Sequence, residues 1–510
     1  MRQGKTFRSL VAGIVAIVTM GLGAKAVAAE RGGTLTVGLY GDATGFELGK
    51  VKSMSQGTIM VAMTVMESLF ALDYDRGDAV IPRLGLSFET APDRMSALVR
   101  LRPGVKFHDG SDFNADAVAF HYTRMLDPNL GTGFYQTLLE PLEKVEAVDA
   151  LTVRFVLKQP WAGLQAALSL DHHMNLIGSP TAVKADPEGF NRKPVGTGPF
   201  VFGEWRTGES IVVAKNPDYW DKDLPYLDRV VFRIMLDENT RFQSLRAGEL
   251  DLAWIENAGN ILEARKDSKL QIYENRGAGA GLWLFNHKKK PFDDPRVRAA
   301  VVHAFDGEAF ASGYYKGTAS PSDGFVSRDS FWHCGASKWR GYDLEKAKSL
   351  VKEIGTPIRF TVNGYGTPDG RRVNAIMQQF MKSAGIDAQI EAFETSRIFP
   401  KILRGEFEMS QFRIPDYGGE PDIPFSHITY RVMGYDNPKM KELIAKARGE
   451  PDRAKRKALY CQVSDLLSED AIQLYPVHNY GYIVGSLAVA DMPRIHNQLI
   501  RTRTIWLRKQ

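Results

Sequence analysis

Two side chains of opposite charge, Arg413 and Asp416, lie three positions apart and are of the types that bind ionic groups of a small ligand. A carboxylate in an enclosed site of low dielectric attracts an ammonium group, and a guanidinium forms forked hydrogen bonds with a carboxylate or a phosphate. Two simpler interpretations stay open: Asp416 could cap a loop beside a glycine pair, and Arg413 could pair internally with Asp416 or Glu420. By residue type, Arg413, Asp416 and the adjacent Tyr417 are therefore candidates for ligand contact, with internal pairing as the alternative.

Motifs for catalysis or metal binding are missing from the sequence. It contains no H-E-x-x-H, no G-x-S-x-G and no C-x-x-C, and nothing assembles into a nucleophile, base and orienting group. His172 and His173 are neighbours, so on regular secondary structure their side chains point different ways. Asp293 and Asp294 fit the start of a helix, where carboxylates complement the helix dipole. We therefore expect a binding protein and not an enzyme, with no metal and no cofactor.

The clearest local patterns lie between residues 343 and 390. Asp343 is a favourable N-cap for a helix with an apolar face, and Gly355 ends that helix. Residues 358–362 alternate as a strand, residues 373–384 carry apolar side chains at helical spacing, and residues 386–390 alternate again. Strand, helix and strand joined by short turns form a βαβ unit, which predicts an α/β lobe around a sheet.

Ligands of such lobes bind in the crevice beyond the carboxyl ends of the strands. This rule directs attention to the loop 364–372, after the first of these strands, and to the loop 415–424, after a strand candidate near 407–414. The first loop contains Tyr365 and Arg371. A simpler interpretation of Arg371 is a charge in the first turn of the following helix.

The N-terminal half carries strand patterns as well. Residues 33–39, 97–107 and 151–157 alternate, with a Pro-Gly turn inside the second segment, and residues 111–125 fit a helix beginning near Asn114 or Asp116. Without a leader the chain has about 480 residues, more than one hydrophobic core usually serves, so two or three lobes are expected.

Residues 1–29 have the pattern of an export signal. Three basic residues precede an apolar run at 10–23, and small residues at 24–29 offer cleavage at Ala28 or a neighbouring site. The run is shorter than the about 20 residues that a membrane-spanning helix needs, so a retained anchor is the less favoured alternative. No cysteine lies near the cleavage site. We therefore expect a periplasmic protein that is not a lipoprotein.

Charge and cysteine content narrow the class of protein further. The chain has 65 Lys and Arg against 60 Asp and Glu, and the leader holds four of the basic residues and no acidic one, so the remainder is nearly neutral. A nearly neutral protein lacks the basic surface that nucleic-acid binding needs. Cys334 and Cys461 would meet an oxidising compartment, where they could form a disulfide; a buried free thiol at Cys461 is the alternative.

Several short motifs follow one another along the chain. They are L-R-P-G-V-K-F-H-D-G (101–110) with F-N-A-D-A-V (113–118), P-V-G-T-G-P-F (194–200), K-N-P-D-Y-W (215–220), P-F-D-D (291–294) with R-V-R (296–298), and Y-D-L-E-K-A-K (342–348). In this order they resemble the family 5 extracellular solute-binding proteins of ABC importers, the group that contains the dipeptide- and oligopeptide-binding proteins. The resemblance runs from about residue 33 to about residue 484.

The resemblance implies an α/β, two-lobed periplasmic-binding-protein fold of the large peptide-binding type (a class II-like Venus flytrap), with an extra subdomain inserted in the first lobe. The first lobe would take residues 30–75, 194–285 and 481–510, the insertion 76–193, and the second lobe 286–480. Two crossing strands would act as the hinge. A monomer would enclose its ligand between the lobes, and closure would signal occupancy to the membrane permease.

The resemblance also assigns candidate ligand contacts. Peptide-binding relatives hold the ligand ammonium with an aspartate in a Trp-Thr-Gly-Asp type segment, and Asp416 falls on that aspartate. Arg413 replaces the tryptophan of that segment and Pro415 its small residue, which weakens the expectation of generic peptide binding. Relatives have a Tyr and an Arg near the loop 364–372, so Tyr365 and Arg371 are carried over.

A glycine-rich segment, residues 277–283, corresponds to a strand that lines the ligand cleft in relatives. Its small residues would let a ligand backbone approach closely, and Trp283 could supply a wall. No helix pattern begins immediately after these glycines, so a nucleotide-binding loop is not indicated.

Taken with the export signal, the resemblance implies a periplasmic binding protein of an ABC importer. Its ligand would carry an ammonium and an anionic group, as short peptides, opines and other amino-acid conjugates do. A metal chelate or haem is the alternative ligand within the family. A secreted hydrolase and a chaperone-like binder of unfolded chains are alternatives from other classes.

Overall fold

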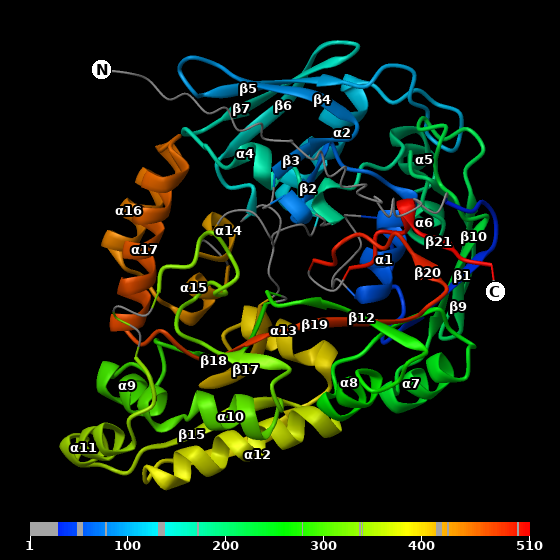
Figure 1. The fold of residues 1–510 in the computed structure, drawn as a ribbon. Coiled ribbons are helices and arrows are strands. Elements are labelled where there is room, and N and C mark those ends of the chain that lie inside the picture. The colour runs from blue at the N-terminus through cyan, green and yellow to red at the C-terminus, as the bar shows by residue number, and fades with distance from the viewer. Residues whose placement is uncertain are drawn as a thin grey trace, which may run out of the picture.

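Two large β-sheets and a smaller one form the framework of the computed structural model (Figure 1). It describes residues 29–47, 55–76, 79–130, 138–170, 173–277, 279–335, 338, 340–414, 421–425, 428–496 and 499–509. We call the part built on the seven-stranded sheet the first lobe and the part built on the six-stranded sheet the second lobe. The residue limits expected for the lobes stay predictions.

The sheet of the first lobe mixes parallel and antiparallel strands. Their order in space is β12 (Leu270–Asn275), β19 (Gly481–Ser486), β11 (Leu252–Trp254), β1 (Thr34–Leu39), β10 (Arg229–Ile234), β9 (Ser210–Lys215) and β8 (Phe200–Arg206). Leu35, Val37 and Leu39 are fully buried, which confirms the strand predicted at 33–39. Because β1 is parallel to β10 and β11, the carboxyl ends of these three strands lie at one edge.

The sheet of the second lobe has the same property. Its strands are β14 (Ala319–Pro321), β18 (Gln473–Asn479), β13 (Ala280–Phe285), β17 (Met409–Ile414), β15 (Arg359–Tyr365) and β16 (Asp387–Phe393). β15 is parallel to both β16 and β17, so these three strands also end at a common edge.

The predicted βαβ unit of the second lobe is confirmed. α11 (Leu344–Ile354) begins after Asp343, whose side chain accepts the Lys346 N–H, and ends at Gly355 with φ +72°. α12 (Pro368–Ser383) connects β15 to β16 and begins after Thr367, whose hydroxyl accepts the Gly370 N–H. The caps explain these boundaries, since each satisfies a backbone donor that the first helical turn leaves free.

A four-stranded antiparallel sheet occupies the region expected to be an insertion. It consists of β4 (Gly85–Thr90), β5 (Ser96–Leu101), β7 (Thr152–Leu157) and β6 (Leu142–Asp149), with α2 (Ala115–Leu126) packed against it. Asn114 is the N-cap of α2, as one of the two predicted starts requires. Within the segment 97–107, β5 ends at Leu101 and the predicted Pro-Gly turn follows, with Gly104 at φ +71°.

The chain passes between the two large sheets twice. β12 continues through residues 276–279 into β13, and β18 continues through Tyr480 into β19. In each passage a strand of the first lobe and a strand of the second lobe follow one another closely in the chain. The two lobes therefore lie next to each other where the chain passes between them (Figure 1).

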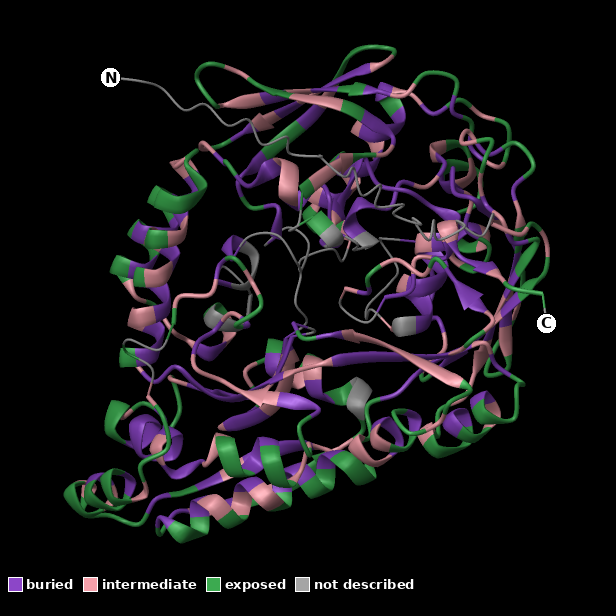
Figure 2. Cartoon of the chain, viewed as in Figure 1, coloured by how far each residue is buried: buried purple, intermediate pink, exposed green. Residues whose placement is uncertain are grey.

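Burial differs between the sheets and the helices that cover them (Figure 2). On β13, Leu282 and Leu284 pack into one core cluster and Trp283 and Phe285 into another, so this strand is buried on both faces. The outward sides of α11 and α12 remain exposed (Figure 2). No helix in the described ranges is long and apolar enough to cross a membrane.

Cys334 and Cys461 form a disulfide that links positions 127 residues apart. It connects the segment after β14 to α17 (Arg453–Glu469). The sequence left two possibilities for Cys461, a disulfide and a buried free thiol. The structure shows the disulfide.

Candidate ligand-binding site between the lobes

The carboxyl ends of parallel strands from both lobes carry the side chains that face each other between the lobes. Tyr40 follows β1 and Glu256 follows β11 in the first lobe. Tyr365 ends β15, and Arg413 lies one residue before the end of β17, in the second lobe. We call these four residues with Trp254 the interlobe site. The strand-end rule that directed attention to the second lobe thus applies to the first lobe as well.

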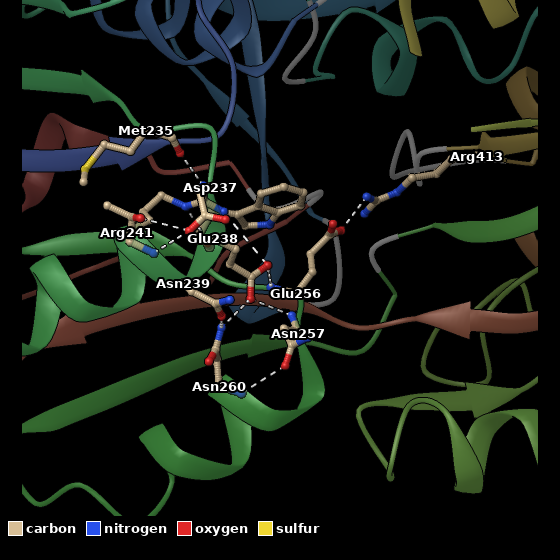
Figure 3. Close-up of polar contacts among 11 residues, drawn as sticks. Met235, Asp237, Glu238, Asn239, Arg241, Glu256, Asn257, Asn260 and Arg413 are labelled. Atoms are coloured by element: carbon tan, nitrogen blue, oxygen red, sulfur yellow. Dashed lines mark hydrogen bonds and ion pairs between the residues drawn. The ribbon is translucent and has the colours of Figure 1, made fainter. Parts of the chain in front are cut away.

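An ion pair between Arg413 and Glu256 joins the two lobes. Arg413 Nη1 donates to Glu256 Oε1 at 2.6 Å, and the two side chains point toward one another (Figure 3). The Arg413 side chain keeps 30% of its surface exposed and that of Glu256 keeps 42%. Both charged groups are therefore accessible to a small molecule while they contact each other.

The backbone around Glu256 is held by hydrogen bonds to the Glu238 carboxylate (Figure 3). Glu238 Oε2 accepts the N–H of Glu256 at 3.0 Å, and Oε1 accepts the N–H of Asn257 at 2.8 Å. Glu238 begins α7 (Glu238–Arg246) and Asn257 is the N-cap of α8 (Ala258–Ala264). Glu256 therefore extends from a rigid connection between β11 and α8.

Arg241 of α7 holds the ends of β10 and β11 in place through hydrogen bonds to their backbone. Its guanidinium donates to the carbonyl oxygens of Trp254, at 2.9 Å, and of Met235, and its exposed fraction is 1%. A Cβ at Gly38 of β1 would lie 2.9 Å from Arg241 Cγ, so glycine at this position leaves room for the arginine. The buried cation stabilises the edge of the sheet through these two carbonyl contacts.

Aromatic rings flank the charge pair. The rings of Tyr40 and Trp254 pack with their centroids 3.8 Å apart, and Arg413 Cζ lies 5.7 Å from the centroid of Trp254. A guanidinium near the face of an indole gains cation–π attraction. Trp254 and Tyr40 thus support Arg413 from the first lobe, although Arg413 belongs to the second.

Within the interlobe site, Arg413 and Glu256 are the charged groups and the two tyrosines are neutral. Burial raises the pKa of Glu256 above its usual value, and the nearby Arg413 guanidinium offsets part of this rise. Burial raises the pKa of Tyr40 and that of Tyr365 to about 12 each, so both phenols are neutral near pH 7 and can donate hydrogen bonds. The site therefore offers one cation, one anion and neutral hydroxyl groups.

The sequence-predicted ligand contacts are only partly brought together. Arg413 and Tyr365 lie close enough for the guanidinium to act on the phenol. The partner of Arg413 is Glu256 of the other lobe, which the sequence did not indicate. Asp416 and Tyr417 lie outside the described residues, as does His172. Their expected roles stay predictions.

Trp283 and Arg371 lie elsewhere. The Trp283 side chain is 1% exposed, donates from Nε1 to Asn374 Oδ1 at 3.0 Å and packs on Phe305 in the core of the second lobe. The structure therefore gives Trp283 a packing role, in place of the expected wall of the ligand site. Arg371 is exposed in the first turn of α12, where Nε donates to the Gly366 carbonyl at 2.9 Å. That placement agrees with the simpler interpretation of Arg371.

Tyr40, Trp254 and Glu256 are the interlobe residues that were not indicated from the sequence. A signal was available for Tyr40 and Glu256, because both follow strand patterns in the way that the loop 364–372 does. Applying the strand-end rule to the short strand Leu252–Trp254 would have indicated Glu256. Among the described residues, no group of three or more His, Cys, Asp or Glu side chains could hold a metal ion.

Two sheets joined by two chain passages, with charged strand ends facing each other, define a two-lobed ligand-binding protein. A family model described as "Bacterial extracellular solute-binding proteins, family 5 Middle" matches residues 79–433. The chain belongs to this family of extracellular and periplasmic solute-binding proteins of ABC importers, whose members are binding proteins and not enzymes.

Individual relatives agree with this assignment. Di/tripeptide-binding protein 2 of Pseudomonas aeruginosa is 30% identical over 464 residues, covering 82% of this chain and 86% of the relative. Glutathione-binding protein GsiB of Pectobacterium atrosepticum is 30% identical over 431 residues, covering 81% and 82%. The structure of the periplasmic binding protein DppA of Helicobacter pylori, in complex with the peptide STSA, has a TM-score of 0.85 at 24% identity, covering 94% of this chain and 99% of that one. The two-lobed α/β fold predicted from the sequence is thereby confirmed.

Proposed function

We propose that this protein is the periplasmic binding component of an ABC importer for a small ligand with both an ammonium and an anionic group. Short peptides, opines and other amino-acid conjugates have this chemistry. The observation that carries the proposal is the accessible ion pair between Arg413 and Glu256, which stands where the two lobes meet. A site lined by one cation and one anion suits a ligand that carries both charges.

Arg413 is the proposed contact for the ligand's anionic group. A guanidinium has five N–H donors, and toward the described residues Arg413 donates from Nη1 alone, to Glu256. The remaining donors can form forked hydrogen bonds with a carboxylate or phosphate. Tyr365 and Tyr40, which are neutral near pH 7, can donate further hydrogen bonds to the same group.

Asp416 is the proposed contact for the ligand's ammonium group. It occupies the position of the ammonium-binding aspartate in the family motif, three residues after Arg413. Two relatives carry names that refer to di- or tripeptides and to glutathione, and both kinds of compound contain an ammonium and a carboxylate. This agreement supports a peptide or amino-acid conjugate over a purely apolar ligand.

The proposed route begins with export and ends at a membrane permease. Residues 1–29 would direct the chain to the periplasm and be removed near Ala28, and the absence of a cysteine there favours a protein without a lipid anchor. The mature monomer would bind its ligand between the lobes and present the closed form to the permease.

Native mass spectrometry of protein purified without denaturation tests the proposal. We expect a bound compound with the mass of a peptide or amino-acid conjugate, which is released on unfolding. Added at 100 times its dissociation constant, that compound should stabilise the protein by about 2.7 kcal/mol, measured as a thermal shift. Asp416→Ala should weaken its binding by about 2–5 kcal/mol. The proposal is overturned if no compound is found and peptides, glutathione and opines all fail to bind.

A further inference from the structure

Glu256 is the anionic half of the interlobe pair, and the family motifs give it no role. Its carboxylate reaches Arg413 across the boundary between the lobes at 2.6 Å and keeps 42% of its surface exposed. A ligand anion that forms a forked hydrogen bond including Nη1 of Arg413 takes the donor that Glu256 uses. The fate of the displaced Glu256 therefore decides which ligands the site accepts.

We propose that Glu256 is a ligand contact, and that Glu256 and Arg413 form a split-charge subsite. A ligand separates the pair, placing its anionic group on Arg413 and its cationic group on Glu256. The subsite thus selects ligands that carry an ammonium as well as an anion, as a free peptide does, over ligands that carry an anion alone. This inference rests on the proposed function and adds a residue and a selection rule to it.

Among the described residues, Arg241 is the other cation whose charge acts on Glu256. The charged or titratable groups that act on Glu256 are Arg413, Arg241, Glu238, Asp369, Tyr40 and Tyr315. Of these only Arg413 and Arg241 are cations. Arg241 is 1% exposed and donates to two backbone carbonyls. A displaced Glu256 must therefore pair with the ligand, take up a proton or stay unpaired.

The energetic difference between these outcomes produces the selection. A ligand with both charges replaces the pair of Arg413 and Glu256 by two pairs, one between Arg413 and its anion and one between Glu256 and its ammonium. Every charge stays compensated, so the displacement of Glu256 costs such a ligand little binding free energy. A ligand with an anion alone leaves a carboxylate among Glu238 and Asp369 without a cation, which is unfavourable in a site partly shielded from water. An ammonium has three N–H donors, so it can bond to Glu256 and to a further acceptor at the same time.

Isothermal titration with two matched probes tests the selection. The probes are the tripeptide Ala-Ala-Ala and its N-acetylated form, which keeps the carboxylate and lacks the ammonium. We expect wild-type protein to prefer the free tripeptide, and Glu256→Gln to weaken its binding by about tenfold or more while leaving the acetylated form unchanged or tighter. Glu263→Gln, at another exposed carboxylate of the first lobe with 62% of its side chain exposed, is the matched control and should change neither affinity.

Proton uptake on ligand binding is a second measurement, and it would not change if Glu256 had only a structural role. Removing Arg413 from Glu256 removes the group that lowers the pKa of this carboxyl. Binding of N-acetyl-Ala-Ala-Ala near pH 6 should therefore be accompanied by proton uptake in wild type and in Glu263→Gln, but not in Glu256→Gln. Titrations in buffers of different ionisation enthalpy measure the protons taken up.

The outcomes separate this inference from the function on which it rests. Failure of Ala-Ala-Ala, glutathione and opines to bind wild type overturns the proposed function, and the split-charge subsite with it. Equal affinity of Ala-Ala-Ala for wild type and Glu256→Gln, in protein with an unchanged melting temperature, overturns the subsite alone. If Glu256→Gln weakens the binding of Ala-Ala-Ala and of its N-acetylated form equally, Glu256 acts in closure of the lobes. That result also overturns the selection rule.

Discussion

Two arginine ion pairs join parts of this molecule, and they differ in burial. Arg413 and Glu256 pair at 2.6 Å between the lobes, with 30% and 42% of their side chains exposed. Arg448 and Asp422 pair at 2.9 Å within the second lobe, with 6% and 4% exposed. The chemistry is the same, but a small molecule can reach only the first pair. Burial, and not the type of residue, decides which pair can serve a ligand.

The surroundings of Arg448 show how a buried pair is used. The guanidinium also pairs with Glu140, which precedes β6, and the carbonyl of Arg448 accepts the N–H of Ala162, which follows β7. Next to it, Arg94 donates to the carbonyl of Gly449, at the end of α16 (Pro438–Gly449), at 2.8 Å. These contacts connect the second lobe to the part of the chain built on the four-stranded sheet, whereas Arg413 donates to the described residues from Nη1 alone.

Removing Arg448 should have the largest effect on stability. Arg448→Met leaves the buried Asp422 carboxylate without its cation, so we expect the free energy of unfolding to fall by about 3–5 kcal/mol. Chemical denaturation followed by fluorescence measures the loss. Glu140→Gln is the control, because Glu140 is 57% exposed and should cost less than about 1 kcal/mol. A loss of that small size in Arg448→Met would contradict the distinction between the two pairs.

Acid should destabilise the protein through His121 of α2, the helix packed on the four-stranded sheet. This residue is 4% exposed, its Nε2 lies 2.7 Å from the Met174 carbonyl, and burial lowers its pKa from the usual 6.5 to about 4. Between these pH values the unfolded chain binds more protons than the folded protein, so stability falls as the pH falls from 6.5 to 4. The full contribution is about 3 kcal/mol, at about 1.4 kcal/mol for each unit of pKa.

Comparison of the stability at pH 7 and pH 4 in wild type and His121→Asn measures this contribution. The variant cannot gain the imidazole proton, so its stability should fall less on acidification. An equal fall in both proteins would assign the acid sensitivity to other groups.

Removing Arg413 should have the smallest effect on stability. Because both side chains of its pair are partly exposed, Arg413→Gln should change the free energy of unfolding by less than about 1 kcal/mol. The same variant should weaken ligand binding, which Arg448→Met should affect only through stability. A loss of several kcal/mol in Arg413→Gln would mean that the interlobe pair is a structural joint like that of Arg448.

Much of the second lobe could be predicted from short-range patterns. The caps Asp343 and Thr367, the stop at Gly355 and the strands on either side of α12 follow from residues within a few positions of each boundary. The loops that follow β15 and β17 could be indicated as ligand loops for the same reason. Trp283 could not be placed, since β13 is buried on both faces and alternation does not tell which face meets a ligand.

The sequence by itself determined the class of this protein. Motif order identified the family, strand and helix patterns indicated the α/β lobes, and the type of residue at 413 marked a departure from the peptide-binding pattern. These conclusions depend on local spacing or on the order of motifs, which the linear chain contains in full.

Only the tertiary structure decided which charges meet. Arg413 finds Glu256 at a separation of 157 residues, and Cys334 finds Cys461 at 127. Such contacts depend on how two sheets are set against each other, and no local pattern encodes that arrangement. Exposure is decided in the same way, because it depends on every element packed around a side chain. For this reason the charge pair at the interlobe site could be found only once both lobes were in place.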